Sequence, residues 1–195
     1  MSNAIGSAGP TEPLLLQALR DATHQSHERV DAAFSVIDLT DKAGYARFLA
    51  AHLVGIAPVY PTFKAFAEQE LNVPSPDFPE MLRLDLEELD TDPSALPALD
   101  APTDPAGAAI CYVVAGSRLG VASIGTGAYW PKGSGTAARY MQDRDGLAIW
   151  RALIGWMRDR TTSLAQADRQ CASAIAAFDL FRQALLVTAS NRVPG

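Results

Sequence analysis

The chain has 195 residues, of which 48% are hydrophobic and 19% are charged, a composition typical of a globular protein rather than a disordered one. The length suits one domain with a single hydrophobic core. A formal net charge of −6 disfavours sequence-independent nucleic-acid binding, which needs a basic surface, so no nucleic-acid partner is expected.

The lack of a disulfide framework, of a transmembrane run and of a signal peptide favours a cytoplasmic location. Cys111 and Cys171 are too few for a disulfide framework, which favours a reducing, cytoplasmic setting. No apolar run reaches about 18 residues, so neither a transmembrane helix nor a membrane partner is expected. Residues 1–10 lack the basic segment and apolar core of a signal peptide. They are predicted to form a flexible tail, followed by one helical domain over residues 11–195.

Apolar residues recur at helical spacing along most of the chain. The predicted helices cover residues 12–34, 41–64, 63–71, 80–88, 106–124, 145–160 and 163–189. In the first of them Thr11 is the expected N-cap and Pro13 fits the first turn, while Pro58 and Pro61 interrupt the second. Residues 90–105 contain four prolines and are predicted to form a surface loop. No period-two run is present, so the fold is predicted to be all-α, a single-domain helical bundle.

The first predicted helix carries a stripe that changes from apolar to polar midway. Leu16 and Leu19 are followed on this stripe by Thr23, and His27 lies one turn further along. Arg20 precedes the histidine by seven residues, two turns back along nearly the same line. A helix that only fills a core would not need this polar change, so His27 is a candidate ligand. The alternative is a structural histidine bonded within the fold.

The predicted helix over 106–124 carries two glycines in its interior, each costing about 1 kcal/mol relative to alanine. Tyr112, Gly116 and Gly120 are spaced four residues apart and therefore share one face. Beyond the tyrosine this face is bare backbone, which indicates that another group approaches it closely. That group is either a second helix packed on small residues or a ligand.

Other catalytic motifs are missing from the sequence. It has no nucleophile elbow, P-loop, dinucleotide-binding glycine motif, Cys-x-x-Cys or paired histidine motif for zinc or di-iron. His24 is expected to be exposed, and His52 to be a hydrogen-bonded core or boundary residue. A histidine on one helix and a side-chain-free face on another are the two walls needed to hold a flat iron macrocycle, with one iron position open to dioxygen. Arg20, about 10 Å from His27 along the helix, would reach a carboxylate at the macrocycle edge.

Two segments resemble the heme oxygenase family. The first comprises residues 19–31, LRDATHQSHERVD, and is similar to the proximal helix, where an Ala-Thr-x-x-x-His run supplies the axial histidine. His27 stands at the position of that histidine, and Asp31 at that of an acidic residue four positions later. Arg20 stands where the family has a cation, more usually lysine, that contacts a heme propionate.

The second segment comprises residues 112–120, YVVAGSRLG, and is similar to the distal helix of bacterial heme oxygenases, Tyr-x-x-x-Gly-Ser-x-Leu-Gly. The mammalian enzymes have Gly-Asp at the first glycine and a further glycine after the second, where this chain has Ser117 and Val121. Weaker similarity at residues 146–151 and 177–181 extends the resemblance over roughly the whole chain after residue 10.

The resemblance implies a heme oxygenase-like fold and the cleavage of heme, with dioxygen and external electrons, to biliverdin, carbon monoxide and ferrous iron. It implies that His27 binds the iron and that Gly116, Ser117 and Gly120 form the catalytic distal wall. The implied heme contacts are Arg20, Thr23, His27, Tyr112, Gly116 and Gly120, with Lys132, Arg139 and Arg151 as further candidates for the propionates.

Heme is then both cofactor and substrate. The implied partner is an electron-donating reductase or ferredoxin. The purpose stays open between iron acquisition and chromophore supply, in which case a bilin-binding photoreceptor accepts the product. Two alternatives from other classes stay open. One is a non-catalytic heme-binding carrier or sensor on the same fold, and the other is a heme-free scaffold in which the glycines only pack helices.

Overall fold

Eight α-helices and one 3₁₀ helix make up the secondary structure of residues 12–130 and 132–190, the residues that this computed structural model describes. They are α1 (Leu15–Ser35), α2 (Lys42–Ile56), α3 (Tyr60–Gln69), α4 (Phe78–Glu87), η1 (Pro93–Ala95), α5 (Gly107–Ile124), α6 (Arg139–Gln142), α7 (Asp145–Met157) and α8 (Leu164–Ser190). No strand is present in this part of the chain, and the prediction of an all-α bundle is confirmed.

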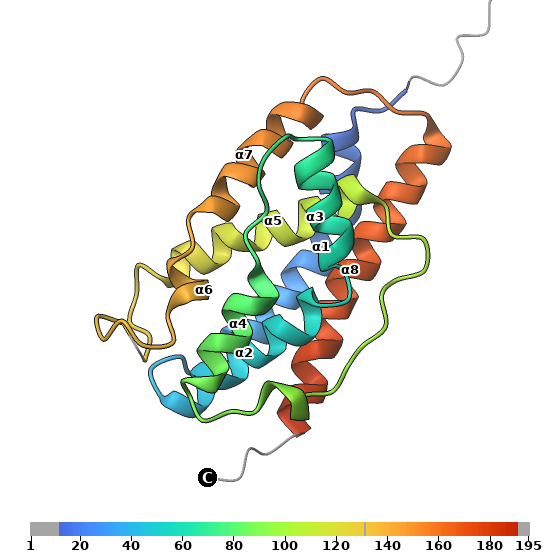
Figure 1. The fold of residues 1–195 in the computed structure, drawn as a ribbon. Coiled ribbons are helices and arrows are strands. Elements are labelled where there is room, and N and C mark those ends of the chain that lie inside the picture. The colour runs from blue at the N-terminus through green and yellow to red at the C-terminus, as the bar shows by residue number, and fades with distance from the viewer. Residues whose placement is uncertain (1–11, 131, 191–195) are drawn as a thin grey trace, which may run out of the picture.

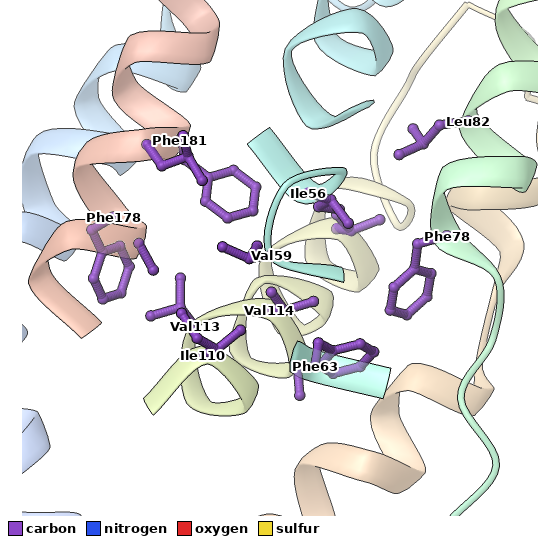
Figure 2. Packing of buried hydrophobic residues seen from close by; sticks show 14 of the residues in the cluster. Ile56, Val59, Phe63, Phe78, Leu82, Ile110, Val113, Val114, Phe178 and Phe181 are labelled. Atoms are coloured by element: carbon purple, nitrogen blue, oxygen red, sulfur yellow. The ribbon is translucent and has the colours of Figure 1, made fainter. Parts of the chain in front are cut away.

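The long helix α8 organises the bundle. It packs against α1, α2 and α5, while α5 also packs against α3 and α7, and α4 lies on α2 (Figure 1). Side chains from α2, α3, α4, α5 and α8 meet in one apolar core, which Figure 2 shows from close by. The helices therefore share a single core, as expected for a single domain.

Helix α1 begins three residues later than predicted. Pro13 is not in its first turn, because the chain before the helix is extended and pairs with the connection between α7 and α8. The amide of Thr162 donates to the Pro13 carbonyl at 3.1 Å, and the amide of Leu15 donates to the Arg160 carbonyl at 2.9 Å. The predicted N-cap, Thr11, and the predicted tail over 1–10 lie outside the described residues.

The second predicted helix is two helices, as its prolines indicated. Asp41 caps α2 by accepting from the Gly44 amide at 2.7 Å, and α2 ends at Ile56. Helix α3 then has Pro61 in its first turn, where the missing N–H is not needed. The four-residue helix α6 was not predicted, because so short a segment has no measurable periodicity.

Two helices are long and apolar enough to cross a bilayer by length and composition alone, Gly107–Ile124 and Leu164–Ala189. Half of each is buried inside the fold, and the core helix of a soluble protein passes the same test, so this is weak evidence for membrane insertion. The prediction that the protein has no membrane partner is therefore not tested by the structure.

Candidate functional site

A cavity of about 440 Å³ is lined mainly by α1 and α5, with further side chains from α2, α7 and α8. Its volume is typical of small-molecule sites, which span roughly 300–1,000 Å³. Most of the wall is apolar or aromatic. The described residues that line it are Arg20, His27, Val30, Asp31, Phe34, Phe48, His52, Tyr112, Val113, Gly116, Ser117, Leu119, Gly120, Val121, Ile124, Trp150, Phe178 and Phe181.

His27 is held by two neighbours in an orientation suited to metal binding. Its Nδ1 lies 3.0 Å from the Oδ2 atom of Asp31, one turn further along α1. Its ring meets the ring of Phe178 edge to face at a centroid distance of 5.6 Å. Because a carboxylate only accepts hydrogen bonds, this contact places a proton on Nδ1, so Nε2 is the ring nitrogen that remains to bind a metal. A carboxylate behind a ligating imidazole is the usual arrangement at protein metal sites.

The two cavity-lining glycines of α5 differ in the space beside their backbone. A Cβ built on Gly120 would meet no atom within 4 Å, so this position opens into free space. A Cβ on Gly116 would lie 3.3 Å from Cζ3 of Trp150, which belongs to α7 and also lines the cavity. Gly116 therefore lines the cavity where α7 packs closely on α5, whereas Gly120 lines it with open space beside its backbone.

The polar groups of the cavity wall are few. Arg20 lies on the lining and is the only lysine or arginine among the described residues there. Tyr112 lies on the same wall as the glycines, and its ring contacts that of Trp150 at 5.7 Å between centroids. Ser117 also lines the cavity, but its hydroxyl donates to the Val114 carbonyl at 2.8 Å.

Thr23 is not among the described residues that line the cavity. Its side chain is buried, and its hydroxyl donates to the Leu19 carbonyl at 2.7 Å, one turn back along α1. The hydrogen-bonding need of the Thr23 hydroxyl is thus met by a carbonyl of its own helix. The predicted heme contact through Thr23 receives no support from this placement.

The further cations considered for the propionates lie elsewhere. Lys132 donates to two backbone carbonyls just beyond α5, and Arg139 pairs with Asp85 of α4 at 2.9 Å. Arg151 donates from Nε to a backbone carbonyl of its own helix at 3.1 Å. None of the three is among the described lining residues, so Arg20 is the cation that the fold brings to the cavity.

His52 is a hydrogen-bonded core residue, as predicted, and it also lines the cavity. It is buried, and its Nδ1 lies 2.8 Å from the Phe48 carbonyl, as expected of a hydrogen-bonded core residue. Burial lowers its pKa to about 4, and the charge of Arg118 adds to this effect. It also lines the cavity, which helical periodicity could not reveal, because periodicity gives a face of one helix and not its neighbour. His24 is exposed, as predicted, and its Nε2 lies 3.3 Å from Oε1 of Glu28.

Taken together, the wall offers two imidazoles, one guanidinium, one carboxylate, one phenol and one serine hydroxyl among mostly apolar side chains. Such a set suits a flat apolar ligand that carries a metal and an anionic edge. The residues present therefore fit a heme. Comparison of the chain with protein-family models and with curated proteins finds no match in either case.

Proposed function

We propose that this protein is a heme oxygenase, cleaving heme to biliverdin, carbon monoxide and ferrous iron. The observation that carries the proposal is that one cavity is lined by both His27 and Gly120, with Arg20 and Tyr112 on its wall. These residues come from two helices separated by more than 70 positions in the sequence. Helix packing alone does not require an imidazole with a free Nε2 and an open glycine at the same cavity.

Each residue has a role in this proposal. His27 binds the iron through Nε2, and Asp31 holds its Nδ1 proton, which fixes the ring and increases the basicity of the ligand. Gly120 leaves space beside the substrate for dioxygen. Arg20 and Tyr112 bind the carboxylates at the heme edge. The iron supplies the oxygen chemistry when heme is bound, and the electrons come from an external reductase or ferredoxin.

The test is a hemin titration of the wild-type protein and of His27→Ala, followed by addition of a reductant under air. The wild-type protein should bind one hemin with the spectrum of a histidine ligand and then lose the heme absorption as a bilin forms. Stable heme after reduction would indicate a carrier or sensor. Failure of the wild-type protein to bind hemin would leave the heme-free scaffold.

A further inference from the structure

His52 is a buried polar side chain on the wall of the cavity. The residue is 6% exposed, and it lines the cavity from α2. Its Nδ1 lies 2.8 Å from the Phe48 carbonyl, and because a carbonyl only accepts, the proton of the ring is on Nδ1. Burial lowers the pKa of the ring to about 4, so at neutral pH the imidazole is uncharged and Nε2 is a hydrogen-bond acceptor.

Nε2 of His52 is open to the cavity. Within residues 12–130 and 132–190, the only hydrogen bond of the ring is the one at Nδ1. In the same part of the chain, the buried side-chain nitrogen and oxygen atoms that lack a partner belong to Arg47, Arg118 and Tyr140. Nε2 also lacks a partner but is not one of these enclosed atoms, so it faces the free space of the cavity. A ligand with a donor at this place would satisfy it.

Aromatic rings surround this imidazole. The rings of Phe48, Phe34 and Phe181 lie 4.2, 4.9 and 6.1 Å from it between centroids, and all three line the cavity. The ring of Tyr140 is 5.4 Å away, but its hydroxyl has no hydrogen-bond partner among the described residues and so does not donate to Nε2. His52 is therefore an acceptor set among apolar rings at one end of the cavity.

This end of the cavity is opposite to the cationic end. Arg20 and Phe34 lie seven residues before and seven residues after His27 on α1, about 10 Å along the helix in each direction. These three residues line the cavity, Arg20 is exposed, and His52 packs on Phe34. A flat ligand whose iron binds His27 and whose carboxylates meet Arg20 therefore has its opposite edge at His52.

Heme and its cleavage product differ in hydrogen bonding at this edge. Opposite its propionates, heme carries only methyl, vinyl and other C–H groups, which are not strong hydrogen-bond donors. When the meso carbon of that edge is lost as carbon monoxide, the two end rings of the bilin become lactams, each with one carbonyl and one N–H. His52 thus has no donor to accept from in the substrate and has one in this product.

We propose that His52 distinguishes the product from the substrate, with Nε2 accepting a hydrogen bond from a lactam N–H of the bilin that is opened opposite the propionates. This rests on the proposed function, because it takes the carboxylate edge of the ligand to lie at Arg20. A bilin opened between the propionates has its lactams at the Arg20 end instead. The same contact therefore makes the heme-free protein selective for one bilin isomer.

The test is a titration of the heme-free protein with biliverdin opened opposite the propionates, followed by absorbance. His52→Leu removes the acceptor and should bind this bilin roughly three- to tenfold more weakly, while it binds hemin at least as tightly as the wild type. His52→Gln places an amide oxygen near the position of Nε2 and should recover most of the bilin affinity. With biliverdin opened between the propionates, the wild type and His52→Leu should bind equally.

Phe48→Leu is the matched control. Phe48 lines the same end of the cavity and its ring contacts that of His52, but its side chain holds no acceptor. This variant should change hemin and bilin affinity by similar factors, whereas His52→Leu should change their ratio. Thermal melting shows whether each variant is folded. If His52→Leu does not fold, the preference of the wild type for the isomer opened opposite the propionates, expected to be threefold or more, decides the question.

Equal bilin affinities of His52→Leu and the wild type would overturn the proposal, and so would a wild type that binds both isomers equally. Either result would leave the assignment as a heme oxygenase intact. Failure of the wild type to bind hemin would instead refute the proposed function, whatever the bilin titrations show.

Discussion

The substitution Gly120→Leu tests whether the glycine face of α5 borders a bound ligand. A Cβ at this position meets no atom within 4 Å, so the leucine enters free space in the heme-free protein. Intrinsic helix propensity improves by up to about 1 kcal/mol, and the variant should be folded and at least as stable as the wild type. A bound substrate changes this result, because four added carbons then compete with it for the cavity. Overpacking of this kind costs about 1–3 kcal/mol, which corresponds to roughly 5- to 150-fold weaker hemin binding.

The matched control is Gly155→Leu on α7. Gly155 is also helical and also has no atom within 4 Å of an added Cβ, but it is not among the described residues that line the cavity. Both variants should therefore gain helix stability, and only Gly120→Leu should lose hemin affinity and heme degradation. Thermal melting, hemin titration and single-turnover degradation measure the three quantities. If Gly120→Leu binds and degrades heme like the wild type, the glycine face is not the wall of the substrate site.

Three further predictions test the remaining parts of the site. His27→Ala should lose the histidine-ligand spectrum and regain part of it with added imidazole, and an unchanged spectrum would move the iron ligand to another residue. Arg20→Glu should weaken hemin binding more than Arg20→Gln, whereas equal affinities would place the propionates on a different cation. The pKa of His52 lies below the unfolded value of about 6.5, so its contribution to stability is complete above pH 6.5 and is lost as the pH falls toward about 4. In urea unfolding between pH 7.5 and about 4.5, the wild type should lose roughly 2.5 kcal/mol more stability than His52→Gln, and parallel curves would contradict the burial argument.

Periodicity predicted the helices and the faces that carry the site, because a repeat of 3.6 residues is a local property of the sequence. His27, Tyr112 and Gly120 line one cavity, as their positions on two helices predicted. The sequence also indicated His52 as a hydrogen-bonded core residue, and its contact with the Phe48 carbonyl agrees.

Other features of these residues depend on contacts between elements, which the spacing within one helix cannot reveal. Gly116 faces Trp150 of α7, a partner that no spacing within α5 can identify. Arg139 is occupied by Asp85 of α4, 54 residues away, and so it is not free to meet a ligand. Arg118 lies within the segment of residues 112–120, yet its burial follows from the packing of Phe78 and Tyr140 on its guanidinium. Charge and spacing alone gave no indication of that arrangement.

The pairing of the chain before α1 with the connection between α7 and α8 bears on how the proximal wall can move. Two backbone hydrogen bonds, at Pro13 and Leu15, fix the first turn of α1, and His27 lies twelve residues further along. At 1.5 Å per residue, the histidine sits roughly 18 Å from this anchor. A tilt of about 5° around it displaces the imidazole by roughly 1.6 Å, nearly the length of a metal–nitrogen bond. The amino-terminal pairing thus fixes the end of α1 from which the position of His27 is set, and, under the proposed function, deleting residues 12–14 should slow hemin binding in a stopped-flow experiment.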